Sequence, residues 1–348
     1  MLKIVLTGGG TAGHVIPCLT LVPELKKYFS KIYYIGSETG IENTLVAKTD
    51  IPFYKIPCVK LRRKLTPKNL LIPFKLKQSI SKCKSILKEL KPDVVFNKGG
   101  YVGLPVVIAS KSLKIPVVSH ESDLTAGLAN KIASRYSAMT LTAFKPTATA
   151  FKNGKHVGIP LKKADKIYDK NAVKSEWGFS VKPTVLAFGG SLGSVALNKA
   201  IFSILDDLLK DYNVLHIVGK NNAVDLPVKN GYTALPYLDD MLKAYAIADV
   251  VISRCGANSA FEILSKNLPC VFIPLPKSES RGDQIENAEY FFKQGYALML
   301  TEDLLTPSSL KLAIDCAYKT KRHKAPVITD ASSEIAKILH SVATKKST

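Results

Sequence analysis

The chain has 348 residues, enough for two domains of ordinary size, and its 46% hydrophobic content supports a full globular core. A net charge of +21 predicts an anionic partner, such as a phosphorylated substrate, an acidic lipid surface or a nucleic acid. No apolar stretch reaches 18 residues, and the six cysteines are scattered without a Cys-x-x-Cys pair, which argues against a membrane span, a disulfide framework and a zinc site. The start of the chain lacks a signal-peptide pattern, so we expect a cytoplasmic protein.

A glycine-rich turn near the start organises the first half of the chain. An apolar run at 2–6 predicts a buried parallel strand, and a helical pattern covers 15–29. Between them stands the turn 8–13, whose glycines expose backbone N–H groups at a helix start and therefore suit a phosphate or another anion. His14 at the mouth of this turn is a candidate for acid–base chemistry, with a structural histidine as the alternative.

The same turn leaves other interpretations open. Gly8, Gly10 and Gly13 fit the dinucleotide pattern G-x-G-x-x-G, and Glu38 follows a second predicted strand at 31–36, so NAD binding is one alternative. A turn that only connects a strand to a helix is another.

Further strands are predicted at 31–35, 53–58, 93–96, 116–119 and 138–142, with helical patterns between most of them. This alternation indicates a doubly wound parallel sheet, whose ligands bind at the carboxyl ends of the strands. Two loops at such ends carry candidate site residues: Gly99, Gly100 and Tyr101 in one, and His120, Glu121 and Asp123 in the other. A helix-capping role is the alternative for Asp123.

The basic segment 60–77 mixes Lys and Arg with large apolar side chains. We interpret Arg62, Arg63, Leu71, Ile72 and Phe74 as a patch that meets an anionic membrane surface, where each base contributes about 1 kcal/mol. The alternative is a basic amphipathic helix with a buried face. A nucleic-acid surface is disfavoured because the segment offers a single aromatic side chain for stacking.

Gly158 and Pro160, followed by a polar stretch, predict a domain boundary. We expect an N-terminal domain at 1–158 and a C-terminal domain at 159–329, with a last helix at about 330–343 that packs back on the first domain. The second half repeats the arrangement of the first, with a strand at 184–188, a glycine turn at 189–193 and a helix at 195–209.

Later strands of the second half, predicted at 213–218, 249–252 and 269–273, carry further candidates. Glu262 lies one turn into a helix after Gly256, where a carboxylate can chelate two sugar hydroxyls or serve the helix dipole. Asp283, Gln284 and Asn287 fall on adjacent turns of one helix and favour a polyhydroxylated ligand, with a solvated helix face as the alternative.

Several blocks of residues follow one another in a specific order and spacing: 8–15, 99–102, 120–121 with 126–128, 189–191, 239–241 with Tyr245, 248–251, 253–254, 256–257, Glu262, and Gln284 with 287–288. In these blocks the sequence resembles the MurG-type family of peptidoglycan glycosyltransferases over nearly the whole chain. Members of this family add N-acetylglucosamine to undecaprenyl-diphospho-N-acetylmuramyl-pentapeptide. The resemblance implies a GT-B fold, with two Rossmann-like, doubly wound parallel-sheet domains that face a cleft.

The resemblance also implies roles for individual residues. The C-terminal domain would hold UDP-N-acetylglucosamine, and the N-terminal domain would hold the lipid acceptor on loops that contain Gly9, Gly10, Gly99, Gly100 and Tyr101. His14 is the first candidate for the general base and Glu121 the second. The donor-binding candidates are Thr11, Gly13, Asp123, Lys162, Ser191 near the diphosphate, the backbone of Leu238 at the uracil, Ala257, Asn258 and Ser259 at the phosphates, Glu262 at the ribose, and Asp283 with Gln284 at the sugar.

The chain departs from the family pattern at several of these positions. His-Glu-Ser-Asp at 120–123 stands where the family often has His-Glu-Gln-Asn, so that a carboxylate replaces an amide near the sugar. Lys162 stands where an arginine is common, which keeps the charge but loses the bidentate geometry. Leu192 and Asp283 each stand where glutamine is common.

The resemblance implies an inverting transfer of N-acetylglucosamine to the 4-hydroxyl of N-acetylmuramic acid, the step from lipid I to lipid II, by an enzyme peripherally bound at the cytoplasmic face of the membrane. The implied partners are a UDP-sugar, a polyprenyl-diphosphate-linked acceptor and an anionic membrane surface, without nucleic acid. No metal-ligand constellation is visible in the sequence, so we expect no cofactor and no obligatory metal. The alternatives are a glycosyltransferase for another lipid such as diacylglycerol, an NAD-dependent oxidoreductase, and a non-catalytic membrane-binding protein.

Overall fold

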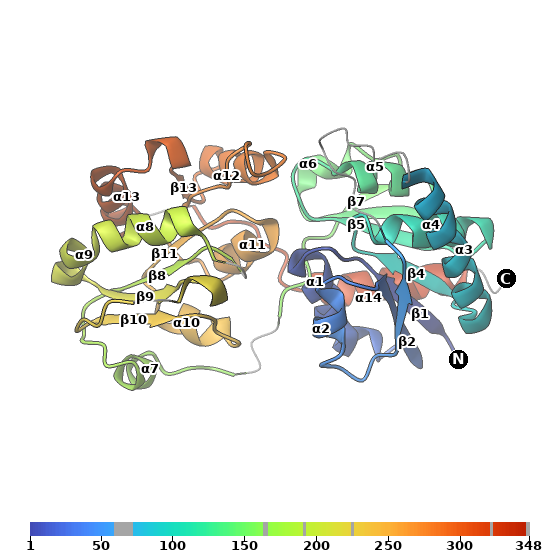
Figure 1. Ribbon diagram of the computed structural model, residues 1–348, viewed down its shortest axis with the longest axis horizontal. Helices are drawn as coiled ribbons and strands as arrows, with labels where there is room; N and C mark the ends of the chain where they lie inside the picture. Colours follow the sequence, from blue (N-terminus) through green and yellow to red (C-terminus); the bar gives the residue numbers. More distant parts are fainter. Residues whose placement is uncertain (59–71, 163–165, 191–192, 224–225, 321–322, 346–348) are drawn as a thin grey trace. The chain divides into compact units, whose positions relative to one another are not determined.

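The computed structural model describes residues 1–58, 72–162, 166–190, 193–223, 226–320 and 323–345. The chain forms two compact units, shown in Figure 1. Met1–Lys162 together with Ile328–Thr348 make the first unit, and Lys163–Val327 make the second. The chain therefore crosses between the units twice, and its last helix belongs to the first unit.

The first unit is built on a parallel sheet of seven strands in the order β3-β2-β1-β4-β5-β6-β7. The strands are β1 (Lys3–Thr7), β2 (Lys31–Ser37), β3 (Phe53–Ile56), β4 (Val94–Asn97), β5 (Val117–Glu121), β6 (Met139–Thr142) and β7 (Gly154–His156). Successive side chains of a strand point to opposite faces, so the central strands are apolar on both sides. Ile4 and Leu6 thus enter one core of the unit, whereas Val5 enters the other.

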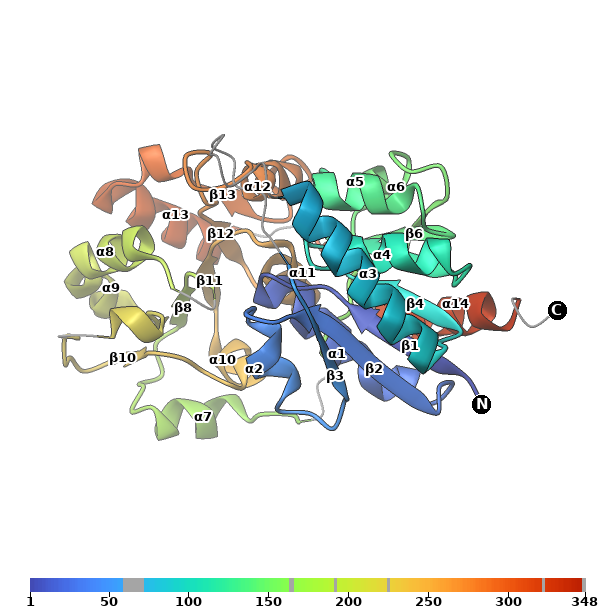
Figure 2. The ribbon, with the colours of Figure 1, turned by 45° about the vertical axis from the view of Figure 1, so that its right-hand side comes forward.

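Helices cover both faces of this sheet. One core is closed by α1 (Ala12–Leu25), by the short α2 (Glu42–Val46) and by α14 (Ala331–Thr344), which contributes Ile335 and Leu339. The other core is closed by α3 (Ile72–Leu90), α4 (Gly103–Ser112) and α5 (Leu128–Ser134), and Figure 2 shows α3 and α4 beside one another. The short α6 (Lys145–Ala148) precedes β7.

The second unit repeats the plan with six parallel strands in the order β10-β9-β8-β11-β12-β13. They are β8 (Thr184–Phe188), β9 (Asn213–Ile217), β10 (Tyr232–Leu235), β11 (Val250–Ser253), β12 (Cys270–Phe272) and β13 (Leu298–Met299). Its α-helices are α7 (Lys170–Glu176), α8 (Val195–Ser203), α9 (Leu205–Asp211), α10 (Met241–Ile247), α11 (Ala257–Ser265), α12 (Asp283–Lys293) and α13 (Pro307–Lys319). The described residues of this unit also form the 3₁₀ turns η2 (Lys220–Asn222) and η3 (Glu302–Leu304).

Two parallel, Rossmann-like sheets confirm the fold class expected from the sequence. The helix expected at 195–209 is wrong in one respect, because it is two helices that meet at Ile204. Ile204 leaves the helical conformation, with φ −119° and ψ 11°, while its buried side chain packs in the core with Leu205 and Leu208. Core packing here outweighs helical continuity. Among the described residues, no helix combines the length and hydropathy that crossing a bilayer requires.

Candidate functional site

Each sheet contains one point where the strand order reverses, between β1 and β4 in the first unit and between β8 and β11 in the second. The helices that follow the two strands at such a point leave toward opposite faces, and this opens a crevice at their carboxyl ends. The loops at these ends are 8–11 and 98–102 in the first unit, and 189–194 and 254–256 in the second. They include the glycine turns singled out in the sequence.

The two glycine loops of the first unit pack directly against each other. A Cβ atom on Gly100 would lie 2.4 Å from the carbonyl oxygen of Gly9 and 3.2 Å from Nδ1 of His14. A Cβ atom on Gly10 would lie 2.5 Å from Cε1 of Tyr101. Gly10 and Gly100 also have φ values of +85° and +80°, a region that favours glycine. The structure therefore brings these predicted residues together around His14, and Gly99 precedes them on the same loop.

His14 lies in the first turn of α1 and is partly exposed. Its Nδ1 is 3.0 Å from the hydroxyl oxygen of the exposed Thr11, and its backbone N–H donates to the carbonyl of Thr11 over 3.1 Å. Gly13 is its neighbour in the chain. The hydroxyl of Thr11 fixes one nitrogen of the ring, an arrangement that suits a proton-transfer group.

Glu42 is a buried carboxylate beneath the first glycine loop, and the sequence reasoning missed it. Its Oε2 accepts the backbone N–H of Gly10 over 3.2 Å. Its Oε1 accepts the backbone N–H of Ser37 over 2.9 Å and also the hydroxyl of Ser37. A Cβ atom on Gly9 would lie 2.6 Å from the carboxylate, so the loop rests on Glu42 and needs glycine to do so. The sequence analysis singled out Glu38 instead, because this residue follows the predicted strand at 31–36.

Glu121, the second candidate for the base, shapes the turn from β5 into α5. It is only 4% exposed, and its two oxygens accept four hydrogen bonds of 2.8–3.0 Å. The donors are the backbone N–H groups of Ser122, Asp123 and Gly127 and the side-chain amide of Asn130. This arrangement is that of a loop-positioning carboxylate.

His120 is fully buried on β5, and its Nε2 lies 2.8 Å from the carbonyl oxygen of Gly158. Burial, with the nearby charge of Lys98, holds the pKa of His120 well below its ordinary value, so the ring is neutral and donates Nε2–H to that carbonyl. This hydrogen bond connects β5, in the core of the first unit, to Gly158, which lies near the point where the chain leaves that unit. Lys162, a few residues further on, is exposed.

In the second unit, the turn after β8 leads into α8. A Cβ atom on Gly193 would lie 2.1 Å from the carbonyl oxygen of Val218, and Gly193 has φ +78°. The hydroxyl of Ser194 then caps α8 by accepting the backbone N–H of Leu197 over 3.3 Å. Ser191, the residue predicted to face the diphosphate, lies outside the described residues, as does Leu192.

Arg254 connects the strand ends of the second unit, and it was not among the predicted site residues. It is 7% exposed at the end of β11 and donates to the hydroxyl of Ser194 over 2.8 Å. It also donates to the carbonyls of Ile273 and Pro274, each over 3.2 Å, and pairs with the carboxylate of Glu302 at 2.6 Å. The guanidinium group of Arg254 thereby fixes the positions of the loops after β8, β11 and β12 relative to one another.

The start of α11 carries three predicted phosphate-binding residues, the buried Ala257 and the partly exposed Asn258 and Ser259. Glu262 follows one turn later, and its Oε2 accepts the hydroxyl of Tyr245 over 3.1 Å. Burial and the neighbouring carboxylate raise the pKa of Tyr245 well above its ordinary value, so the hydroxyl keeps its proton and remains a donor.

Gln284, on the first turn of α12, comes close to this helix start. A Cβ atom on Gly256 would lie 4.0 Å from Nε2 of Gln284, whose Oε1 accepts the backbone N–H of Leu275 over 3.1 Å. Asp283 is partly exposed and lies 3.6 Å from Nε of Arg281. Asn287 is buried instead and donates to the carbonyl of Cys255 over 3.4 Å, so it serves the core. Leu238 is partly exposed in the loop between β10 and α10.

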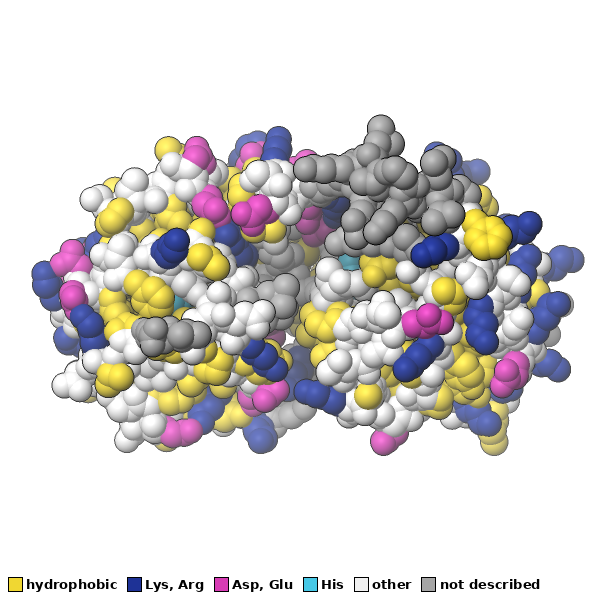
Figure 3. Space-filling model, viewed as in Figure 1, with side chains coloured by type: hydrophobic (Ala, Val, Ile, Leu, Met, Phe, Trp, Pro, Cys, Tyr) yellow, Lys and Arg dark blue, Asp and Glu magenta, His cyan; other side chains and the backbone are white. Residues whose placement is uncertain are grey.

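Of the predicted membrane patch, Arg62, Arg63 and Leu71 lie outside the described residues, and Ile72 begins α3. Phe74 is 72% exposed, and Lys75 and Lys77 beside it are also exposed. Figure 3 shows Lys and Arg side chains on the part of the first unit where α3 and α4 lie in Figure 1. A groove of about 870 Å³ runs along this helix and is lined by Glu38, Thr39, Pro57, Cys58, Phe74, Lys75, Lys77, Gln78, Ser81, Lys82 and Ser85.

The part of the chain that the structure describes contains no group of three or more His, Cys, Asp or Glu side chains with metal-binding geometry.

Comparison with known proteins covers both units. The profile of the glycosyltransferase family 28 N-terminal domain matches residues 4–142, and that of the family 28 C-terminal domain matches residues 184–342. A curated relative from Lachnospira eligens is named UDP-N-acetylglucosamine--N-acetylmuramyl-(pentapeptide) pyrophosphoryl-undecaprenol N-acetylglucosamine transferase. It is 43% identical over 339 residues, which are 96% of this chain and 96% of the relative. A relative of the same name from Clostridium perfringens strain SM101 is 44% identical over 325 residues, covering 92% of this chain and 91% of the relative.

Among solved structures, MurG from Acinetobacter baumannii superposes with a TM-score of 0.75 at 27% identity and covers 98% of this chain and 100% of its own. The glycosyltransferase of kitacinnamycin has a TM-score of 0.68 at 14% identity, with 98% of this chain and 95% of its own covered, and shares the fold.

Proposed function

The chain belongs to glycosyltransferase family 28, and on this basis we propose that it transfers N-acetylglucosamine from UDP-N-acetylglucosamine to the 4-hydroxyl of N-acetylmuramic acid in undecaprenyl-diphospho-muramoylpentapeptide. The observation that carries the proposal is identity of 43–44% with relatives named for this transfer, over more than nine-tenths of the chain. The glycine loops at both strand-order reversals lie where this fold binds its ligands.

The second unit binds the donor. The N-termini of α8 and α11 offer backbone N–H groups to the diphosphate, and Arg254 holds their loops in place. Glu262 accepts the ribose hydroxyls, in an orientation fixed by Tyr245. Gln284, close to the start of α11, binds hydroxyls of the sugar.

The first unit binds the acceptor and supplies the base. The acceptor oxygen attacks the anomeric carbon, the bond from that carbon to the β-phosphate oxygen breaks, and UDP leaves from the opposite face, so the linkage is inverted. The hydroxyl of Thr11 accepts Nδ1–H of His14, and Nε2 takes the proton of the attacking hydroxyl. Backbone N–H groups stabilise the charge on the departing diphosphate, and the scheme requires neither a metal nor a cofactor.

Replacement of the base tests this role. His14→Ala should lower kcat by about 10²–10⁴-fold, the usual contribution of a positioned base, with little change in UDP affinity. His323→Ala provides a matched control, because this histidine is exposed in the second unit. An unchanged kcat in His14→Ala would remove His14 from the mechanism.

The substrates are tested by UDP release in detergent. The donor is UDP-N-acetylglucosamine and the acceptor a short-chain lipid-diphospho-muramyl-pentapeptide, with UDP-glucose and diacylglycerol as controls. Turnover with the first pair alone supports the proposal. Turnover with a control pair would move the protein to another lipid-glycosylating function.

The acceptor is lipid-linked, so the enzyme works peripherally at an anionic membrane surface on its cytoplasmic side. The exposed Phe74 and the lysines beside it on α3 support this contact, because an aromatic ring can enter the interface while the ammonium groups meet acidic headgroups. Replacing Leu71, Ile72 and Phe74 by Ser should reduce sedimentation with acidic liposomes and leave UDP binding intact. Leu312→Ser, an exposed apolar residue of the second unit, is the control. Equal sedimentation of the triple variant and the parent would contradict the assignment.

A further inference from the structure

Glu42 is the buried carboxylate beneath the first glycine loop, and the mechanism above gives it no role. It stands at the start of α2, and its side chain is fully buried. The backbones of three glycines enclose it. A Cβ atom would lie 2.6 Å from Oε1 if placed on Gly9, 2.8 Å from Cγ if placed on Gly36, and closer still on Gly40. Close packing by these backbones confines the carboxylate to one position.

The two oxygens of this carboxylate bind different segments of the first unit. Oε1 accepts the backbone N–H and the hydroxyl of Ser37, at the end of β2. Oε2 accepts the backbone N–H of Gly10 over 3.2 Å. All three partners are donors, which suits an ionised carboxylate because such a group only accepts. Glu42 therefore links the end of β2 to the glycine loop that follows β1.

Gly10 is the residue of the loop that this link fixes, and it directly precedes Thr11. Its α-carbon packs against the ring of Tyr101, since a Cβ atom there would lie 2.5 Å from Cε1. Thr11 in turn contacts His14 twice: its hydroxyl oxygen is 3.0 Å from Nδ1, and its carbonyl accepts the backbone N–H over 3.1 Å. Gly10, held by Glu42 and Tyr101, thus sets the position from which Thr11 reaches the imidazole.

The hydroxyl of Thr11 selects the tautomer of His14. A neutral imidazole carries its proton on one nitrogen and accepts a proton at the other. When Thr11 accepts Nδ1–H, Nε2 is the basic nitrogen, as the mechanism above requires. A displaced Thr11 would no longer hold the proton on Nδ1, and the ring with its proton on Nε2 cannot take another from the acceptor at that atom.

We propose that Glu42 is a positioning residue for His14, because through Gly10 it holds Thr11 where the hydroxyl keeps the ring proton on Nδ1. This inference rests on the proposed function, in which His14 is the base. It assigns to Glu42 a part in the reaction, exerted through the glycine loop, in addition to its contribution to stability.

Glu42→Gln tests the link to Gly10. An amide has a single acceptor oxygen, so the variant can serve Ser37 only by turning its own N–H groups toward the N–H of Gly10, where donors oppose each other. The substitution should therefore release Gly10 and let the ring proton of His14 move from Nδ1 to Nε2. NMR of the ring nitrogens at alkaline pH, where an imidazole is neutral, measures the tautomer without any substrate. The signals that disappear in His14→Ala identify His14.

Turnover gives a second readout of the same variant. Glu42→Gln should lower kcat by about 10- to 100-fold per folded enzyme, because the base loses both its tautomer and its position. The KM for UDP-N-acetylglucosamine should stay the same, because in the proposed function the second unit binds this donor.

Two controls separate this role from a loss of stability. Ser37→Ala removes a hydroxyl at the other oxygen of the carboxylate and leaves the contact with Gly10, so the tautomer of His14 should not change. Val46→Ala removes apolar packing from α2, where Val46 is fully buried in the core. It should lower the temperature of unfolding and leave both the tautomer and kcat as they are.

If Glu42→Gln does not fold, Glu42→Asp replaces it. Its carboxylate is nearer the backbone by one methylene group and cannot reach Ser37 and Gly10 together, so the same change of tautomer is expected.

The outcomes separate this inference from the proposed function, because turnover tests the function whereas the tautomer is measured on the protein alone. No turnover, together with a change of tautomer in the Glu42 variant and not in the controls, would reject the proposed function and keep the link from Glu42 to His14. A ring proton on Nε2 in the parent protein, an unchanged tautomer in the Glu42 variant, or the same change in Val46→Ala would overturn the inference.

Discussion

Removal of the Tyr245 hydroxyl should weaken the binding of UDP through one part of the molecule, its ribose. Tyr245 is buried, its hydroxyl donates to Glu262 over 3.1 Å, and its raised pKa keeps the proton in place at any working pH. Tyr245→Phe leaves the ring and its packing against Phe188 unchanged. The carboxylate of Glu262 then loses one hydrogen bond, which in the proposed mechanism orients it toward the ribose.

A hydrogen bond to a charged group contributes about 1.5–3 kcal/mol, and partial exposure of Glu262 favours the lower part of this range. Tyr245→Phe should therefore weaken UDP binding by about 12- to 30-fold, since 1.4 kcal/mol corresponds to a factor of ten. Isothermal titration calorimetry with UDP and with 2′-deoxy-UDP measures the effect. The loss should be largest for UDP, because the deoxy analogue already lacks a hydroxyl that Glu262 would bind.

Tyr232→Phe is the matched control, because it removes a hydroxyl that lies 3.2 Å from Nδ1 of His216 within the core of the same unit. It should change stability and leave UDP affinity as it is. Equal weakening of UDP and 2′-deoxy-UDP by Tyr245→Phe would show that Tyr245 does not act through the contact of Glu262 with the ribose, and the reasoning would fail.

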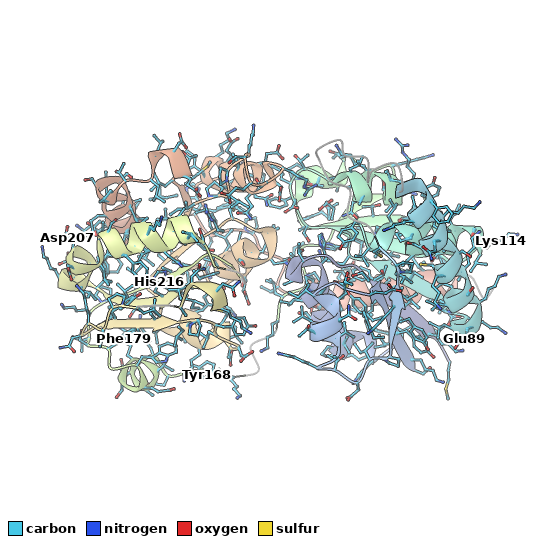
Figure 4. All side chains as sticks on the ribbon, viewed as in Figure 1. Glu89, Lys114, Tyr168, Phe179, Asp207 and His216 are labelled. Atoms are coloured by element: carbon cyan, nitrogen blue, oxygen red, sulfur yellow. The ribbon has the colours of Figure 1, made fainter. Side chains whose placement is uncertain are left out.

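Two further predictions concern buried ionisable groups. Glu42→Gln should lower the free energy of unfolding by about 2–4 kcal/mol in a denaturant titration, because an amide cannot accept hydrogen bonds from all three donors. Ser37→Ala, the control, should lower it by about 1 kcal/mol. Equal losses in the two variants would refute the central role of the carboxylate. Burial lowers the pKa of His216, labelled in Figure 4, from 6.5 to about 4. The unfolded chain then takes up a proton first as pH falls, so stability should decrease by about 3 kcal/mol in total between pH 6.5 and pH 4. Denaturant titrations across this range check it: His216→Gln should flatten the slope, and an identical slope in that variant would contradict the assignment.

The glycine turns could be predicted from the sequence because such a turn depends only on residues that are neighbours in the chain. A strand, a run of glycines and a helix stand next to one another in the chain, and a doubly wound sheet brings the ends of its strands to one edge. That is why Gly10, Gly100 and His14 could be expected at a single site before their packing was known. The three strands that the sequence did not indicate, β7, β10 and β13, are edge strands of two to four residues, too short for a clear apolar run.

The buried residues that hold the glycine loops in place could not be predicted from the sequence, because their roles depend on tertiary contacts. Glu42 reaches Gly10 only because α2 turns back under the loop, and nothing in a spacing of 32 residues indicates this. Arg254 was part of a recognised block, but its partners at Ser194, Ile273 and Glu302 come from three other segments. Lys98 was not singled out among the many bases of the sequence, and its burial is evident only in the structure.

The return of α14 to the first unit has a consequence for biosynthesis. The residues of α14 that close the core beside α1 follow the whole second unit in the chain. The second unit is continuous from Lys163 to Val327, so all of its parts have been synthesised before the first unit receives Ile335 and Leu339. Domains generally fold as units during synthesis, from the N-terminal end onward. In this chain we expect the reverse order: the second unit is complete in sequence before the first, whose apolar face beside α1 stays uncovered until α14 has been synthesised.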